Sequence, residues 1–216
     1  MPLSPALQHL RLRDATGHER TLGGFRGKVL VLAPAMTLCQ ETCPIDTAGL
    51  VETARRVDRA GLGHDVEFVT VTVDPQRDTP RQLAAYRRLF EPTPPNWLTL
   101  TGSRNDVMEL WRTIGVYVHQ VTTHAQPPPT NWRTGRPLTY DVDHSDEVFF
   151  FDARQHDRFV LEGMPHINHS AAVPRALLAF MGKRGRGNVA HPTGPVWTVD
   201  QALRVLGWLT GQRIPA

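Results

Sequence analysis

Residues 29–44 read VLVLAPAMTLCQETCP, and this stretch decides the fold class. Its first part, residues 29–36, is a continuous apolar run of strand length, without the polar alternation of a half-exposed strand. Such a run is typical of a strand covered on both faces, as in a parallel or mixed sheet flanked by helices. The stretch therefore predicts a buried strand that leads through two cysteines into a helix.

Strand and helix patterns alternate on both sides of this stretch. Residues 7–13 and 19–22 are expected to pair as an N-terminal hairpin across a DATG turn. Further strands are expected at residues 66–73, 97–100, 147–151 and 158–161, and helices at 50–61, 79–90, 103–114, 171–181 and 198–209. This order of elements predicts an α/β protein built as a three-layer sandwich.

Two segments lack these patterns. Residues 120–139 are rich in Pro, Thr and Gly and are expected to form a long loop, and residues 182–187 (GKRGRG) a flexible, charged connector. We therefore divide the chain into a main domain, 1–182, and an extension, 183–216, made of a basic linker and a C-terminal helix. The apolar face of that helix should pack on the body of the protein or on a partner, and the first is favoured.

The composition excludes several classes of protein. The chain has 216 residues, of which 40% are hydrophobic and 21% charged, so collagen-like, coiled-coil and disordered proteins are ruled out. A net charge of +3 without basic residues clustered in a nucleic-acid-binding motif argues against a nucleic-acid partner. The longest apolar run, 29–36, is far short of the roughly 18 residues of a membrane span, and the N-terminus does not resemble a signal peptide. We therefore expect neither feature in this chain.

The two cysteines, Cys39 and Cys43, lie four residues apart between the buried strand and the next helix. Thiols at this spacing in the first turn of a helix lie on one face, where they could meet one ion or each other. Because a helix N-terminus favours thiolate, we expect at least one thiol pKa below the usual value of about 8.5. Thiolates suit Cu(I) and Zn, and mixed sulfur and nitrogen donors suit Cu(II). The spacing alone indicates functional thiols without choosing metal or redox chemistry, and two unrelated buried cysteines are the structural alternative.

Four segments in series resemble the Sco/SenC family of copper-binding proteins. They are FRGKV at 25–29 with the apolar strand after it, CQETCP at 39–44, VTVDPQRDTP at 71–80 and VDHS at 142–145. The resemblance covers about residues 9–181. It implies a thioredoxin-like fold, here with an N-terminal hairpin and a C-terminal helical extension, and a role in assembling the copper site of cytochrome c oxidase.

By this resemblance Cys39, Cys43 and His144 are the ligands of one copper ion, Cu(I) or Cu(II). Asp78 is then a residue near the copper site, although turn and helix-cap chemistry accounts for it equally well, and Asp74 is assigned mainly to the turn. The implied partner is a copper-acceptor protein, a subunit of cytochrome c oxidase, and the implied location is the extracytoplasmic face of a membrane. Gln40 departs from the proline that commonly follows the first cysteine in this family.

Two functions from different classes fit the same cysteine pair. A metallochaperone would bind copper and transfer it without turnover, whereas a thiol-disulfide oxidoreductase would cycle the pair between dithiol and disulfide. His144 separates the two hypotheses, because copper binding needs it and disulfide exchange does not. The reductase spacing is usually C-x-x-C, not the C-x-x-x-C found here. A thiol peroxidase is a weaker third hypothesis, since nothing marks either cysteine as peroxidatic.

The remaining histidines and the arginine pairs are interpreted more simply. His119 and His124 lie near the long loop, and residues 164–169 (MPHINH) could form an accessory soft-metal site through Met164, His166 and His169. Solvated loop positions are the favoured interpretation of these residues. The arginine pairs at 55–56 and 87–88 are taken as solvated helix faces.

Overall fold

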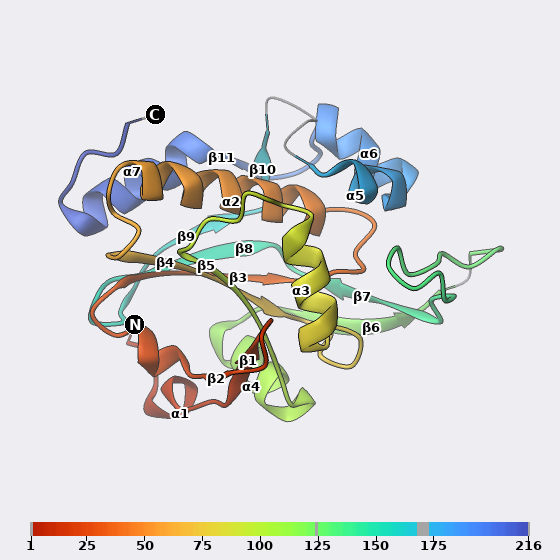
Figure 1. Ribbon diagram of the computed structural model, residues 1–216, viewed down its shortest axis with the longest axis horizontal. Helices are drawn as coiled ribbons and strands as arrows, with labels where there is room; N and C mark the ends of the chain where they lie inside the picture. Colours follow the sequence, from red (N-terminus) through yellow and green to blue (C-terminus); the bar gives the residue numbers. More distant parts are fainter. Residues whose placement is uncertain (1, 124, 168–172, 216) are drawn as a thin grey trace.

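A mixed β-sheet covered by helices on both faces forms the centre of the molecule (Figure 1). The computed structural model describes residues 2–123, 125–167 and 173–215. Within them the large sheet has the strand order β2-β1-β5-β4-β3-β8-β9, and β6 with β7 and β10 with β11 form two small ribbons. The three-layer α/β sandwich predicted from the sequence is confirmed.

The strands of the large sheet and of the two ribbons are β1 Leu12–Asp14, β2 Glu19–Arg20, β3 Val29–Ala35, β4 Val66–Thr72, β5 Trp97–Gly102, β6 Val118–Thr122, β7 Tyr140–His144, β8 Glu147–Phe151, β9 Asp157–Glu162, β10 Met164–His166 and β11 Val196–Thr198. The helices are α1 Pro5–Gln8, α2 Cys43–Arg59, α3 Pro80–Arg88, α4 Arg104–Ile114, α5 Arg175–Phe180, α6 Lys183–Ala190 and α7 Val199–Thr210, with a 3-10 helix, η1, at Leu22–Phe25. None of the described helices is long and apolar enough to cross a bilayer.

Strand β3 is buried along its whole length, as its apolar sequence predicts. It pairs in parallel with β4 and antiparallel with β8, so both of its edges are occupied. Val29, Val31 and Ala33 of β3 lie in the core cluster that contains residues of α2 and α7, whereas Leu30 and Leu32 lie in the cluster that contains residues of α1 and α4. The strand therefore has no solvated face, which explains why polar residues do not alternate along it.

The helices divide between the two faces of the sheet. Figure 1 shows α2 and α7 together on one face, and α1 and α4 on the other. Thr198 begins α7 with a capping box, and Ala202, Leu203 and Leu206 of this helix are buried in the core cluster that contains α2. The apolar face expected on the C-terminal helix is thus covered by the chain itself.

Three local predictions are corrected in whole or in part, and in each the apolar pattern is weak. Residues 5–8 form helix α1, capped by Ser4, so the hairpin is reduced to β1 and β2. The first residues of the predicted loop 120–139, residues 120–122, belong to β6, which pairs with β7 directly after the loop. The expected connector 182–187 belongs to helix α6, whose buried face includes Gly185 and Asn188 in place of large apolar residues.

The helix expected at 171–181 is described as α5 from Arg175, and the first residues of that prediction lie outside the described residues.

The arginine pairs are more than solvated faces, which corrects that interpretation. Arg55 donates hydrogen bonds to the carbonyl oxygens of Phe90 and Pro92, and Arg87 lies over the ring of Trp97. Arg56 pairs with Glu52 at 3.0 Å and reaches Asp200 of α7 at 3.2 Å.

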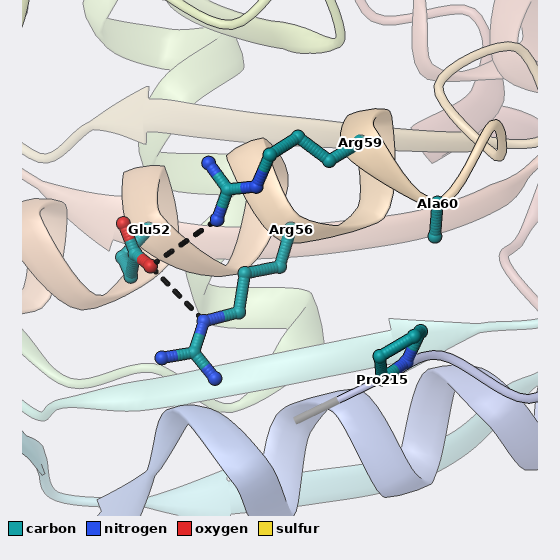
Figure 2. A pocket seen from close by; sticks show the side chains of 5 residues that line it. All are labelled: Glu52, Arg56, Arg59, Ala60 and Pro215. Carbon is teal, nitrogen blue, oxygen red and sulfur yellow. Dashed lines mark hydrogen bonds and ion pairs between the residues drawn. The ribbon is translucent and has the colours of Figure 1, made fainter.

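A pocket of about 370 Å³ lies beside Arg56, lined by Glu52, Arg56, Arg59, Ala60 and Pro215 (Figure 2). Both arginines turn toward Glu52 in this view, so the ion pairs of α2 form its polar wall. The pocket lies at the C-terminal end of α2, the end opposite Cys43.

Shortening Leu206 should test the packing of α7. Leu206 is fully buried in the core cluster that contains α2, so Leu206→Ala should lower the free energy of unfolding by about 2–5 kcal/mol. The exposed neighbour Arg204 provides the control, and Arg204→Ala should stay within about 0.5 kcal/mol of wild type. Urea denaturation measures both. Equal stability of the two variants would mean that α7 does not support the core.

Candidate metal centre

The candidate site lies where two parallel strands end. Because β3 and β4 are parallel neighbours, the segments that follow them leave the sheet at the same edge. We call residues 36–42 the cysteine loop, because it carries Cys39 and leads into α2, and residues 73–79 the acidic loop, because it carries Asp74 and Asp78. Strand β7 ends at His144. The topology therefore gathers the two cysteines, the two aspartates and the histidine near one edge of the sheet.

The two cysteines occupy different kinds of backbone. Cys43 is the first residue of α2 and is followed by Pro44, whose fixed φ suits the first turn of a helix. Cys39 lies in the cysteine loop, where its sulfur accepts a hydrogen bond from the Glu41 N–H at 3.4 Å. The prediction that both thiols lie in the first helical turn is therefore wrong for Cys39. Both thiols are free and buried.

His144 meets Cys43 across 101 residues of sequence. The Cys43 Sγ and His144 Nε2 atoms are 3.2 Å apart, and the side chains are 0% and 4% exposed. The other ring nitrogen, Nδ1, is 3.0 Å from the Ser145 carbonyl oxygen and 3.5 Å from an Asp146 carboxylate oxygen. These acceptors favour the tautomer with the proton on Nδ1, which leaves a lone pair on Nε2 facing the thiol.

The electrostatic surroundings disfavour thiolate at Cys43 when no metal is bound. Burial raises the pKa of the Cys43 thiol well above its ordinary value, and contact with Cys39 and the charges of Asp146 and Asp46 raise it further. The expectation of a lowered thiol pKa is therefore wrong for Cys43, because desolvation outweighs the helix dipole. Burial and Asp146 also raise the pKa of Asp46.

The donor set fits a soft or borderline metal ion. Two sulfurs and an imidazole nitrogen are donors that copper accepts in both of its common oxidation states. Within the described residues, no three His, Cys, Asp or Glu side chains already have the arrangement of a complete metal site. Cys43 and His144 are in contact, and Cys39 is near enough to act on the pKa of Cys43. The fold thus brings two of the donors into contact and holds the third beside Cys43.

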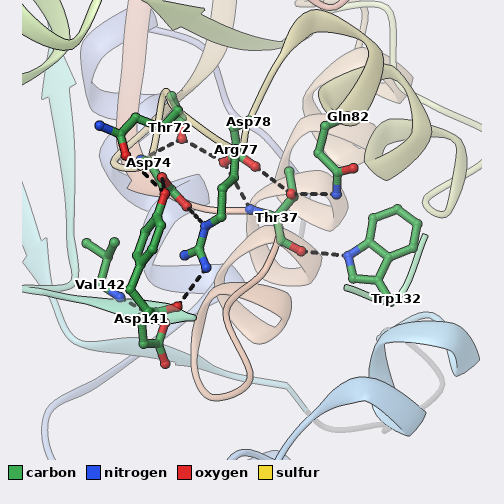
Figure 3. Close-up of polar contacts among 11 residues, drawn as sticks. Thr37, Thr72, Asp74, Arg77, Asp78, Gln82, Trp132, Asp141 and Val142 are labelled. Atoms are coloured by element: carbon green, nitrogen blue, oxygen red, sulfur yellow. Dashed lines mark hydrogen bonds and ion pairs between the residues drawn. The ribbon is translucent and has the colours of Figure 1, made fainter. Parts of the chain in front are cut away.

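Asp78 fixes the cysteine loop to the sheet. Its buried carboxylate accepts hydrogen bonds from the Thr37 N–H at 3.1 Å, from the Thr37 hydroxyl and from the Thr72 hydroxyl at 2.6 Å. Figure 3 shows these bonds converging on Asp78, with Gln82 donating to the Thr37 hydroxyl from α3. Thr37 precedes Cys39 by two residues, so Asp78 holds the backbone that carries the first thiol.

Asp74 acts on the other side of the site. It accepts a hydrogen bond from the Tyr140 hydroxyl at 2.9 Å and forms an ion pair with Arg77. Arg77 in turn donates to the Tyr140 carbonyl oxygen at 2.7 Å and lies over the Tyr140 ring. Asp74 also accepts turn hydrogen bonds through its own carbonyl, as expected. It therefore combines the turn with a contact to β7, the strand that ends at His144.

The structure adds four residues that the sequence did not single out: Arg77, Trp132, Tyr140 and Asp146. The Trp132 indole donates to the Thr37 carbonyl oxygen at 2.7 Å, which ties the loop between β6 and β7 to the cysteine loop. Asp146 had a local signal, a carboxylate two positions after the histidine in VDHSD, and Arg77 lies within the motif VTVDPQRDTP, three residues after Asp74. The contacts of Trp132 and Tyr140, and the contact of Arg77 with Tyr140, span more than 60 residues and are beyond the reach of spacing rules.

The other histidines form no second site in the described part of the chain. His119 lies in β6 and stacks on Tyr117, Met164 is buried, and His166 is exposed. His124 and His169 lie outside the described residues, so the accessory cluster is described only in part.

Comparison with known proteins gives the family. The SCO1/SenC family model matches residues 4–177. The chain belongs to the SCO1/SenC family. The match ends within α5, so α6, β11 and α7 follow it.

The similarity extends to curated SCO1/SenC relatives. The mitochondrial SCO2 homologue of Homo sapiens is 32% identical over 141 residues, which are 65% of this chain and 48% of that protein. The SCO1 homologue of Bacillus subtilis is 26% identical over 109 residues, 50% of this chain and 55% of that protein. The chain spans about half the length of the curated relatives it matches.

Solved SCO1/SenC structures share the fold. ScoI of Arabidopsis thaliana, solved with copper bound, superposes with a TM-score of 0.57 at 24% identity, covering 74% of this chain and 87% of that one. A SCO1/SenC family lipoprotein from Bacillus anthracis gives a TM-score of 0.60 at 23% identity, covering 83% and 96%. These likenesses, with the mixed sheet and its two helical layers, confirm the predicted thioredoxin-like fold.

Replacing Asp78 should alter how folding stability depends on pH. Burial, together with the charge of Asp74, raises the pKa of Asp78 to about 6 from an ordinary value of 3.8. The folded protein therefore binds more protons than the unfolded chain, so the stability contributed by Asp78 increases as the pH falls from about 7 to about 4. The full increase is about 3 kcal/mol. Asparagine does not titrate, so Asp78→Asn should lack this increase.

Urea denaturation of the wild type and of Asp78→Asn at several pH values gives the comparison. The gap in unfolding free energy should widen in favour of the wild type as the pH falls. Parallel pH profiles would contradict the raised pKa.

Proposed function

We propose that this SCO1/SenC protein binds one copper ion through Cys39, Cys43 and His144 and passes it to an acceptor protein. The observation that carries the proposal is the 3.2 Å contact between Cys43 Sγ and His144 Nε2, which the fold brings together from distant parts of the chain. A structural pair of cysteines would not need an imidazole nitrogen turned toward it. In this role the protein is a binding and transfer protein, without catalytic turnover.

The protein's own groups prepare the donors. The Ser145 carbonyl oxygen and the Asp146 carboxylate accept the hydrogen of Nδ1 of His144. Nε2 therefore keeps its lone pair for a metal ion or for the Cys43 proton. Metal binding must displace the proton that burial retains on Cys43. Copper, when bound, supplies a centre that can exchange thiolate and imidazole ligands between two proteins. Because three donors leave a coordination position open, a ligand of the acceptor can bind the copper before this protein's own ligands dissociate.

Asp78 and Asp74 are positioning residues in this proposal. Asp78 holds Thr37 in the cysteine loop, and Asp74 with Arg77 holds Tyr140 at the start of β7. One restrains the segment that carries Cys39 and the other the strand that carries His144.

The acceptor in this proposal is a subunit of cytochrome c oxidase. Arabidopsis ScoI was solved with copper bound, and the structural neighbour BsSco is a member of the Sco family of cytochrome c oxidase assembly proteins. The proposed location is the extracytoplasmic face of a membrane. Curated relatives are named as mitochondrial and the Bacillus anthracis neighbour as a lipoprotein, in keeping with this location.

A thiol-disulfide oxidoreductase is the second candidate. Cys39 and Cys43 are both free, and contact with Cys39 raises the pKa of Cys43, so the pair is close enough to interact. A disulfide switch has been identified in BsSco. In this alternative the same pair exchanges electrons with a partner dithiol or disulfide, and His144 is not required.

Copper stoichiometry tests the ligand set. The reduced wild type should bind one copper per chain. Loss of a residue that only hydrogen-bonds to a metal ligand weakens metal binding roughly 10- to 100-fold. Cys39→Ala removes a ligand itself, so its copper affinity should fall by a larger factor. Equilibrium dialysis of Cu(I) against a competing chelator measures both values. Equally tight binding by the two proteins would remove Cys39 from the site.

Replacing His144 separates the two candidate functions. His144→Ala should weaken Cu(II) binding by more than 100-fold while changing the Cys39–Cys43 dithiol-disulfide potential much less, because only the metal needs the imidazole. The exposed His166 provides a matched control, and His166→Ala should leave both quantities unchanged. A copper titration and a glutathione redox titration on the same preparations give the two readouts. Unchanged copper affinity in His144→Ala would favour the oxidoreductase.

A further inference from the structure

Helix α6 lies against the backbone between the two cysteines, although it follows the end of the family match. The Gly182 N–H, at the N-cap of α6, donates a hydrogen bond to the Gln40 carbonyl oxygen at 2.9 Å. Gln40 directly follows Cys39. A backbone hydrogen bond from outside the cysteine loop thus fixes the peptide next to the first thiol.

Gly185 allows the close approach of the helix to the loop. A Cβ atom added at this position would clash with the Gln40 carbonyl oxygen and would lie 2.9 Å from Glu41 Cα. These obstacles are backbone atoms, which cannot turn aside as the end of a flexible side chain can. Gly185 has ordinary helical conformation, so its lack of a side chain serves the contact and not the backbone angle.

A charge pair and an apolar anchor complete the contact. Arg184 approaches Glu41 at 3.4 Å, but both side chains are well exposed, so the pair adds little free energy. Met181, just before the N-cap of α6, and Val189, in its last turn, are buried in the main core cluster. The helix is therefore attached to the body of the protein, and through the helix the cysteine loop is attached as well.

We propose that α6 is a positioning element of the cysteine loop, with Gly182 and Gly185 as its contact residues. Cys39 lies in a loop without the hydrogen-bond ladder of a helix, so contacts from outside decide how far its thiol can move. Thr37 is held by Asp78, and Gln40 is held by α6. Cys39 lies between the two attachments. The consequence for copper rests on the proposed function, whereas the consequence for the mobility of the Cys39 thiol does not.

Gly182 offers a matched pair of variants. Its φ of −67° and the extended conformation of Met181 before it both suit proline. Gly182→Pro removes the N–H and places a ring carbon in its position, so the bond to Gln40 is lost. Gly182→Ala keeps the N–H, and its Cβ would meet the Gln40 oxygen at an ordinary 3.7 Å. The alanine variant is the control.

Gly185 and Gly187 form a second pair on the same helix. Gly185→Ala must push the backbone of Gln40 and Glu41 away, whereas a Cβ at Gly187 has nothing within 4 Å. Both substitutions raise helix propensity equally. A difference between them therefore reports the contact with the cysteine loop.

Alkylation of the reduced, full-length protein with iodoacetamide provides the main readout, and fragment-ion mass spectrometry separates Cys39 from Cys43. Cys39 is 7% exposed in the wild type, and releasing the loop should expose its thiol. Gly182→Pro and Gly185→Ala should each raise the Cys39 alkylation rate at least fivefold and weaken Cu(I) binding at least tenfold. Their two controls should match the wild type. Variant rates equal to those of the controls would overturn the proposal.

Two further measurements keep the proposal falsifiable. Amide hydrogen exchange on the wild type needs no variant, and the Gly182 N–H should be protected; fast exchange there would overturn the proposal even if a variant failed to fold. If the wild type bound no copper, the proposed function would fail, while a faster alkylation of Cys39 in the two variants would still support the positioning role of α6.

Discussion

The hydrogen bonds of the buried Asp78 carboxylate are the interaction on which the candidate site depends. They join the ends of two neighbouring parallel strands, through Thr72 at the end of β4 and Thr37 just after β3. A carboxylate without these donors would be costly at this depth, so the charge and the fold are coupled. The same bonds place the cysteine loop over the edge of the sheet, where β7 delivers His144. The position of the Cys39 thiol thus follows from the hydrogen bonds of Asp78 to Thr37. The position of the Cys43 thiol follows from the start of α2.

The sequence was sufficient for the parts of the fold that carry strong periodicity. The apolar run at 29–36 has no solvated face, and β3 proves to be buried on both sides. The capping residues Thr79, Ser103 and Thr198 each begin a helix as expected, because a side-chain oxygen accepts from the first free N–H groups. Cys39, Cys43, His144, Asp74 and Asp78 were named from motif order, and the fold gathers them at one edge.

Other parts could not be predicted, for physical reasons that differ. Strand β6 is mostly exposed and carries no apolar alternation, and the alternation in β7 (YDVDH) covers only five residues. Helix α6 buries a glycine, which has no hydrophobic signature. The pKa of Cys43 depends on burial and on Asp146, and the local sequence shows neither. A prediction from the helix dipole alone therefore lowers this pKa, whereas the folded protein raises it. Long-range contacts such as Trp132 with Thr37 become visible only once the chain is folded.

X-ray absorption spectroscopy of the copper-loaded protein tests the central claim most directly, because it counts the donor atoms around the metal. For Cu(I) added at one equivalent, we expect two sulfur donors and one imidazole nitrogen, with the imidazole contribution absent from His144→Ala. A spectrum with no sulfur donors, or one in which His144→Ala retains the imidazole contribution, would contradict the assignment of Cys39, Cys43 and His144 as the copper ligands.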